Sequence, residues 1–191
     1  MKTLIVYAHP KTHGHCSTIL SEVERILEHN KISYDILDLY KMKYNPVLHE
    51  KEHYTAGNHN ISKQNKMIQN LIKKSDKLIF IYPNWWNSPP AILKGFFDRV
   101  LTPKFAYEFD KGIPKKLLTG KKAAVFVTSG SKWLLYRIFE KGLASYLIKK
   151  YVLKFCGIKT KVFEIGSATK LDSKQVKKIQ KAAAKGMKYI Y

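Results

Sequence analysis

The sequence predicts a single α/β domain with a five-stranded parallel sheet, ordered 2-1-3-4-5, and helices on both faces. Short apolar runs alternate with amphipathic segments five times along the chain, which is typical of parallel strands joined by crossover helices. The 191 residues, of which 45% are hydrophobic, suffice for one packed domain. In a sheet of this order, ligands bind beyond the carboxyl ends of the strands, where the strand order reverses.

The first half of the chain begins with a strand and a helix. A short apolar run predicts a strand at 3–8, and Pro10 stops it. The first helix is expected to start at Ser17 or Thr18, because Ser17 suits an N-cap and apolar residues then recur at helical spacing. The other expected elements of this half are a strand at 33–37, a long polar loop at 41–61 and a helix at 62–74.

The second half of the chain repeats the strand–helix order three times. A strand at 77–82 ends at Pro83, and two prolines at 89–90 suit the first turn of a helix at 91–101. The segment 102–120 is expected to be another loop. The last expected elements are strands at 122–128 and 160–165, a helix at 133–155 in one or two pieces around Gly142, and a helix at 173–189.

Charge is distributed unevenly along the chain. Thirty-five Lys and Arg residues against 14 Asp and Glu give a net charge of +21. Residues 111–191 hold 20 basic and 3 acidic residues, a net of +17, which leaves +4 for residues 1–110. Such a field favours anions, including phosphates, nucleic acid and acidic membrane surfaces. The alternative is a solvated lysine-rich surface without a partner.

The sequence predicts neither a membrane span nor a disulfide framework. No apolar run approaches the roughly 20 residues that a spanning helix needs. The N-terminal MKTLIVYAHP is too short for a signal peptide and is interpreted as a buried strand. The two cysteines, Cys16 and Cys156, match no metal-ligand spacing. We therefore expect a cytoplasmic protein without a bound metal.

Three loops at the carboxyl ends of predicted strands hold the candidate binding residues. The first, PKTHGHCST at 10–18, combines hydroxyl groups, a glycine and a helix N-terminus, which suit a phosphate group. It is not the dinucleotide fingerprint, because G-x-G-x-x-G is absent. His9 is interpreted as a neighbour of that phosphate, since the nearby histidines lack a matched carboxylate for a metal. The alternative is that Ser17 only caps the helix.

The other two loops suit a flat, aromatic ligand. The segment NWWN at 84–87 places two indole rings after a buried strand. The alternative is that one Trp packs in the core and the other caps a helix. In the segment TSGS at 128–131, Gly130 permits close backbone approach and the hydroxyl groups offer polar contacts. The alternative here is an ordinary turn at a strand end.

Four segments, in order along the chain, resemble one known family. They are DLYKMKYNPV at 38–47, YPNWWNSPPAILKGFFDRV at 82–100, FAYEF at 105–109 and LTGKKA at 118–123. Together they resemble the flavodoxin-like NAD(P)H:quinone reductases, the DT-diaphorase type with its smaller bacterial relatives. The match covers most of the chain, and the block at 82–100 is long and specific.

This resemblance implies a flavin cofactor and its contacts. Tyr136 matches a family tyrosine that lies close to the flavin ring, and it would donate a hydrogen bond or proton to the acceptor. The chain departs from the family at Gly142, where larger enzymes carry a histidine, and in reading TSGS for TTGG. The implied contacts of the phosphate end are His9, His15, Cys16, Ser17 and Thr18, and those of the ring are Asn84, Trp85, Trp86, Asn87, Thr128, Ser129, Gly130 and Ser131.

The resemblance also implies a reaction and an assembly. Hydride would pass from NAD(P)H through the flavin to a quinone-like acceptor in a two-electron step. FMN is expected, with FAD as the alternative, because the chain lacks the extra C-terminal region of the larger FAD-dependent relatives. Trp85 or Trp86 with Phe105 would form an apolar wall around the acceptor. In relatives a second subunit supplies part of that wall, so a homodimer is expected.

A regulatory function is the alternative. Some small relatives are ancillary subunits of potassium-efflux transporters. The basic segments 132–155 and 173–189 fit contact with an anionic membrane or with such a transporter, or they simply cover the sheet. Nucleic-acid binding is less favoured, because the charge permits it but the sequence contains no recognised module.

Overall fold

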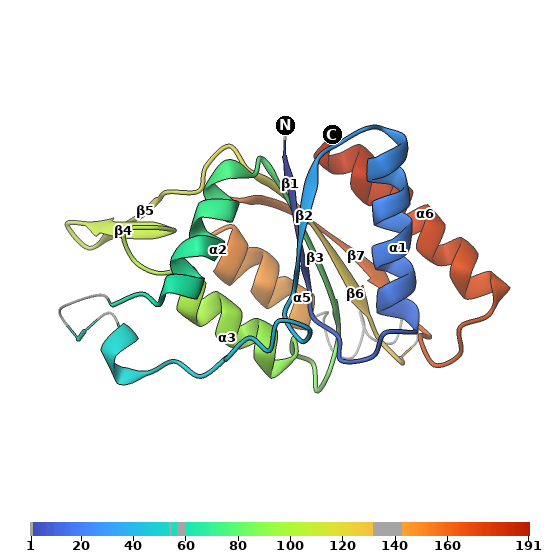
Figure 1. The fold of residues 1–191 in the computed structure, drawn as a ribbon, viewed down its shortest axis with the longest axis horizontal. Helices are drawn as coiled ribbons and strands as arrows, with labels where there is room; N and C mark the ends of the chain where they lie inside the picture. Colours follow the sequence, from blue (N-terminus) through green and yellow to red (C-terminus); the bar gives the residue numbers. More distant parts are fainter. Residues whose placement is uncertain (1, 54, 57–59, 132–142) are drawn as a thin grey trace.

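The computed structural model describes residues 2–53, 55–56, 60–131 and 143–191, and a five-stranded parallel sheet lies at its centre (Figure 1). Every neighbouring pair in this sheet is parallel. Counted along the chain, the strand order is the predicted 2-1-3-4-5, which confirms the predicted sheet. In spatial order the strands are β2 (Tyr34–Asp38), β1 (Thr3–Tyr7), β3 (Lys77–Pro83), β6 (Lys122–Thr128) and β7 (Lys159–Ile165).

Helices cover both faces of the sheet (Figure 1), because successive side chains of a strand point to opposite faces. Ile5 and Tyr7 belong to the core cluster beneath α1 (His15–His29) and α6 (Ser173–Ile190). Leu4 and Val6 belong to the cluster on the other face. That face carries α2 (Lys63–Lys74), α3 (Ala91–Val100), the short α5 (Leu143–Leu147) and the π-helix η2 (Ile148–Leu153).

The segment expected to be a loop at 102–120 contains a β-hairpin. Strands β4 (Tyr107–Asp110) and β5 (Ile113–Lys116) pair antiparallel and project from the body of the molecule (Figure 1). Lys111 and Gly112 between them have φ angles of 48° and 82°, as in the two-residue turns that fit the twist of a hairpin. The prediction of a loop was wrong because β5 is exposed along its whole length and shows no apolar alternation.

Helix α1 begins earlier than predicted. Its N-cap is Gly14, whose carbonyl accepts the first helical bond, from the Thr18 N–H at 2.9 Å. Ser17 lies inside the first turn and its hydroxyl donates to the same carbonyl at 2.9 Å, so the predicted Ser17 cap was wrong. The backbone of Gly14, with φ at 142° and ψ at −165°, lies in a region that essentially only glycine adopts. Of the helix predicted at 133–155, residues 133–142 lie outside the described chain, and residues 143–153 form α5 and η2.

The segment between β2 and α2 is fixed to α3 by a buried ion pair. It contains the short 3-10 helix η1 (Glu50–Glu52). Arg99 donates to both Glu52 carboxylate oxygens at 2.8 Å, and the two side chains are each 6% exposed. The Arg99 guanidinium also donates to the Asn45 carbonyl. The hydrogen bonds from Arg99 lower the pKa of Glu52. This bidentate pair gives the predicted loop a defined path across α3.

Candidate functional site

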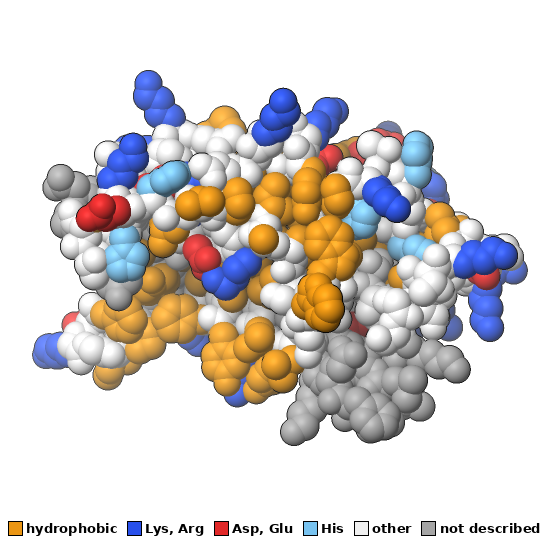
Figure 2. All heavy atoms as spheres, turned by 90° about the horizontal axis from the view of Figure 1, so that it is seen from below, with side chains coloured by type: hydrophobic (Ala, Val, Ile, Leu, Met, Phe, Trp, Pro, Cys, Tyr) orange, Lys and Arg blue, Asp and Glu red, His pale blue; other side chains and the backbone are white. Residues whose placement is uncertain are grey.

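The carboxyl ends of β1, β3 and β6 meet at one cavity, as the strand order predicts. Figure 2 looks onto this edge of the sheet and shows histidine side chains beside a band of hydrophobic ones. The cavity has a volume of about 360 Å³. Its lining includes His9, Lys11, His13, Gly14, His15, Cys16, Pro83, Asn84, Trp85, Thr128, Ser129, Gly130, Ala168, Thr169 and Leu171.

A fourth loop, after β7, completes the cavity and was not predicted. Ala168, Thr169 and Leu171 contribute to the lining. The Ala168 N–H donates to the Ser129 carbonyl at 2.8 Å, which holds this loop against the loop after β6. The same rule that identified the other three loops applies to β7, because β7 is also a parallel strand of the sheet. That rule was the available signal.

The N-terminus of α1 points unpaired backbone groups at the cavity. No side chain caps Gly14, and the first N–H groups of a helix have no intrahelical acceptor. The first turn contains no acidic residue. These groups and the helix dipole favour an anion such as a phosphate. Of the predicted phosphate contacts, His9, His15 and Cys16 line the cavity, whereas Ser17 lines a neighbouring cavity and Thr18 donates its hydroxyl to the Gly14 carbonyl.

Two of the three histidines in the lining, His9 and His15, favour the neutral state. Burial lowers the pKa of His9, whose Nδ1 accepts the Lys11 N–H at 3.0 Å. Burial also lowers the pKa of His15, against an opposing hydrogen bond to the Lys170 backbone and the charge of Asp172. The His15 Nε2 atom is buried and has no hydrogen-bond partner in the described part of the chain. A buried polar atom of this kind is costly unless a ligand or water satisfies it.

The segment 84–87 forms a tight turn that exposes both indoles. Trp85 and Ser88 exchange two backbone hydrogen bonds at 3.0 Å, and Trp86 and Asn87 have φ angles of 53° and 55°. Trp86 is 99% exposed and Trp85 is 40% exposed, so the alternative of a core Trp was wrong. A left-handed backbone conformation is strained for a residue such as Trp86, and residues in strained conformations occur preferentially at functional sites.

Asn84 ties this turn to the loop after β6. Its backbone N–H donates to the Thr128 carbonyl at 2.7 Å. Its side-chain Oδ1 is buried and, like the His15 nitrogen, has no hydrogen-bond partner among the residues described. Asn84 therefore presents a second unsatisfied polar atom in the lining of the same cavity. The His9 ring lies beside Trp85, with ring centroids 5.9 Å apart, and closes this side.

The third predicted loop is held by backbone bonds, and its glycine remains open to the cavity. The Ser129 N–H donates to the Ile165 carbonyl at 3.0 Å, and the Ser131 carbonyl accepts the Ser167 N–H at 2.9 Å. A Cβ atom at Gly130 would approach only the Thr169 methyl, at 3.8 Å. Among the described residues, nothing else approaches Gly130 closely, so this side of the glycine could take a ligand.

Cys16 is a packing residue of the site. Its Sγ lies 3.3 Å from the Thr128 Oγ1 and is buried. Burial raises the pKa of the thiol to about 12, so it stays protonated and is not a nucleophile at neutral pH.

Besides Ser17 and Thr18, five predicted site residues are not in the lining of this cavity: Trp86, Asn87, Ser131, Phe105 and Tyr136. Tyr136 lies outside the described residues. Phe105 is 7% exposed and belongs to the core beneath α2 and α3, so its predicted place in an acceptor wall was wrong. Across the described ranges, no three His, Cys, Asp or Glu side chains converge on a point where they could hold a metal ion. Nor does any described helix have the length and apolar character to cross a bilayer.

Comparison with known proteins identifies the family. A family described by its flavodoxin-like fold matches residues 1–190. A protein of Haemophilus influenzae named as an uncharacterized NAD(P)H oxidoreductase is 35% identical over 188 residues, covering 96% of this chain and 93% of its own. The chain belongs to the flavodoxin-like NAD(P)H:quinone oxidoreductase family.

Other similar proteins extend the comparison. Human ribosyldihydronicotinamide dehydrogenase [quinone] is 29% identical over 203 residues, covering 95% of this chain and 88% of its own. A crystal structure from Streptococcus mutans, 32% identical, superposes with a TM-score of 0.87 and covers 98% of this chain and 100% of its own. General stress protein 14 of Treponema denticola, in complex with FMN, shares the fold at 22% identity and a TM-score of 0.66, covering 100% and 98%.

Proposed function

We propose that the cavity binds FMN and that the protein passes hydride from NAD(P)H to a quinone-like acceptor. The observation that carries this proposal is the convergence of an uncapped helix N-terminus, two orphaned polar atoms and the exposed Trp85 indole at one cavity. FAD is the alternative cofactor, since the same groups suit either flavin. Relatives named as NAD(P)H and quinone dehydrogenases support the reaction class.

The residues divide between the two ends of a flavin. The N–H groups at the start of α1, with His9 and Thr18 beside them, would hold the phosphate. The orphaned Asn84 Oδ1 accepts a hydrogen bond and so suits a ring N–H, and the Gly130 face leaves room for a flat ring. The proposed ring contacts are Asn84, Trp85, Trp86, Asn87 and 128–131. When bound, the flavin supplies the hydride chemistry, and the protein positions it.

The acceptor side is proposed to use Trp86 and Tyr136. The Trp86 ring is free to stack on a flat acceptor, since its side chain is almost wholly exposed. Tyr136 would donate a proton to the reduced acceptor, as the family resemblance implies. The variant Tyr136→Phe is expected to slow acceptor turnover while leaving reduction by NAD(P)H intact. Unchanged acceptor turnover would remove Tyr136 from the mechanism.

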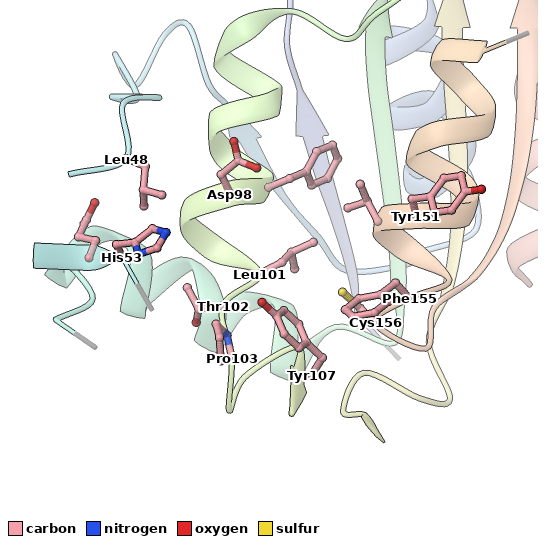
Figure 3. A pocket seen from close by; sticks show the side chains of 13 residues that line it. Leu48, His53, Asp98, Leu101, Thr102, Pro103, Tyr107, Tyr151, Phe155 and Cys156 are labelled. Atoms are coloured by element: carbon pink, nitrogen blue, oxygen red, sulfur yellow. The ribbon is translucent and has the colours of Figure 1, made fainter. Parts of the chain in front are cut away.

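We also propose a homodimer formed through the side of the molecule that carries the β4–β5 hairpin. A cleft of about 330 Å³ lies there between the segment 48–53, α3, the start of the hairpin and η2 (Figure 3). Leu101, Tyr107 and Phe155 point into it. These three side chains are half-buried, and a cluster of exposed apolar residues around such a cleft marks an interaction surface. The exposed ones on these elements and their neighbours are Val47, Leu48, Phe109, Ile113, Leu143, Tyr146, Leu147 and Tyr151.

The dimer has a direct test. Light scattering should give twice the chain mass for the wild-type protein. Replacing both hairpin residues, Phe109→Asp with Ile113→Asp, should give monomers that retain their circular dichroism, because these side chains are 62% and 71% exposed and contribute little to the core. A monomeric wild-type protein would refute the homodimer.

The flavin proposal is tested by the visible spectrum of the purified protein. We expect a yellow protein, or a colourless one that takes up added FMN. Failure to bind either FMN or FAD would overturn the proposal. Anaerobic bleaching by NADH or NADPH then separates an enzyme from a flavin-binding ancillary subunit of a transport system, which would hold flavin without rapid reduction. We place the protein in the cytoplasm, because its two cysteines are buried and unpaired.

A further inference from the structure

Helix α6 carries a row of five lysines on its exposed side, which we call the lysine stripe. Its members are Lys174, Lys178, Lys181, Lys185 and Lys188. Their spacing of four, three, four and three residues keeps them within about 80° around the helix, since each residue turns about 100°. The row is about 21 Å long at a rise of about 1.5 Å per residue. All five side chains are exposed.

Folding does not explain the stripe. The core-facing side of α6 is formed by other residues, including Ile179, Ala183 and Met187. Like charges three and four residues apart destabilise a helix, and lysines in the first turns oppose the helix dipole. None of the five forms an ion pair within the described parts of the chain, and α6 itself contains no acidic residue. Lys178 donates to the Gly166 carbonyl at 3.3 Å, and the other four ammonium groups have no hydrogen-bond or ion-pair partner among the described residues. For those four the stripe is a stability cost without a compensating contact in the described chain.

We infer that the lysine stripe contacts the surface of an anionic lipid bilayer. A straight row of ammonium groups meets a flat anionic surface along its whole length. Leu171, before the first turn of α6, is 41% exposed. An exposed apolar side chain beside a basic helix suits the headgroup level.

Nucleic acid fits the stripe less well. Binding of single strands uses aromatic side chains among the basic ones, and specific duplex binding uses Arg, Asn and Gln at base edges. Between the lysines, α6 exposes Gln180 and Ala184 but no aromatic side chain. Tyr189 is half-buried, near the ammonium groups of Lys122 and Lys161. The stripe therefore offers charge alone, which an anionic bilayer satisfies.

Helix α6 starts close to the candidate flavin cavity, so a contact between α6 and a bilayer would place the cavity near the membrane. Its first turn follows directly on Leu171, which lines the candidate flavin cavity. Helix α6 lies on the outer side of α1, away from the β4–β5 hairpin, so the proposed dimer leaves it free (Figure 1). Adsorption through the stripe would hold the cavity near the bilayer surface, where lipid-soluble quinones partition. This consequence, unlike the contact itself, rests on the proposed function.

Vesicle sedimentation with matched variants tests the inference. The probe is phosphatidylglycerol–phosphatidylcholine vesicles, with pure phosphatidylcholine for comparison, in about 0.1 M salt. One variant combines K181Q, K185Q and K188Q. Its control combines K63Q, K66Q and K74Q on α2, which removes the same charge from exposed positions on the opposite face. Each lysine near an anionic surface contributes about a fivefold change, so the stripe variant should bind about 100-fold more weakly.

The results separate the inference from its alternatives. Strong loss in the stripe variant, with less than about a threefold loss in the control, supports the stripe. Equal losses, or no binding of wild-type protein to anionic vesicles, overturn it. Stripe-dependent binding to a DNA duplex that outcompetes the vesicles also overturns it, in favour of nucleic acid. Flavin content and reduction of a water-soluble quinone, measured on the same preparations, test the proposed function independently, because the stripe lysines do not touch the cavity.

Discussion

Gly14 offers a sharp test of the candidate site, because its cost of substitution comes from the backbone alone. Its φ of 142° and ψ of −165° lie in a region that essentially only glycine adopts. A Cβ atom built there meets no atom within 4 Å, so Gly14→Ala creates no clash. The expected cost is the backbone strain itself, about 1–3 kcal/mol.

The strain in Gly14→Ala can lower either the stability of the protein or its affinity for FMN, and both can be measured. If the helix start stays in place, the variant should unfold about 2–4 °C lower per kcal/mol, hence about 2–12 °C lower. If the first turn of α1 shifts instead, its N–H groups leave the phosphate position, and FMN affinity should fall about tenfold per 1.4 kcal/mol. Thermal unfolding of the apoprotein and fluorescence titration with FMN separate the two outcomes.

The matched control is Gly130→Ala, in the same cavity. Gly130 is not among the described residues with positive φ, and its Cβ would make only an ordinary contact of 3.8 Å with Thr169. The apoprotein should therefore keep the wild-type melting temperature. If Gly14→Ala matched the wild type in both stability and FMN affinity, or if Gly130→Ala lost as much stability, the reasoning from backbone geometry would fail.

Three further predictions follow from buried charge, a titrating histidine and the strained turn. Arg99→Met should lower the free energy of unfolding by about 3–5 kcal/mol in urea titrations, because it leaves the buried Glu52 carboxylate without its charged partner. The double variant with Glu52→Gln should recover much of that loss. The pKa of His15 is lower in the folded protein than in the unfolded chain, where it is about 6.5. Its contribution to the free energy of unfolding is therefore complete above about pH 6.5 and is lost as the pH falls below that value. His15→Gln should flatten the dependence of the melting temperature on pH in this range, and an unchanged dependence would contradict the prediction. Trp86→Asn should raise stability by about 1 kcal/mol, since Asn tolerates the left-handed turn, while raising the KM for quinones; a destabilised variant would count against strain at Trp86.

The sheet was predictable because its signals are redundant. Each strand is a short apolar run bounded by turn residues, and each lies before an amphipathic helix. A buried parallel strand must be apolar on both faces, and few other structures produce that pattern. The positions of the binding loops then followed from topology alone, since parallel strands all end at the same edge of the sheet.

The missed features had weak or misleading local signals. The β4–β5 hairpin is exposed, so its sequence carries no burial pattern, and only Lys111-Gly112 marks its turn. From the sequence, Ser17 is a better N-cap candidate than Gly14, because serine side chains commonly cap helices. In the structure the helix begins after Gly14, whose backbone angles suit glycine. Phe105 was assigned to the acceptor wall from its motif, but a motif does not say which side of the sheet a side chain faces.

The cavity and the basic surface attract anions through different interactions, the cavity through backbone N–H groups and the surface through lysine charges. At the cavity, His9 and His15 favour the neutral state, and Lys11 is the only lysine in the described lining. A cofactor phosphate there would be held chiefly by backbone N–H dipoles, which are fixed in direction and act only at short range. The +17 of residues 111–191 is therefore not needed to hold the cofactor. Six of the 20 basic residues of 111–191 lie on α6. Their exposed charges are screened by salt, so the proposed contact with an anionic bilayer should weaken with ionic strength while FMN affinity changes little.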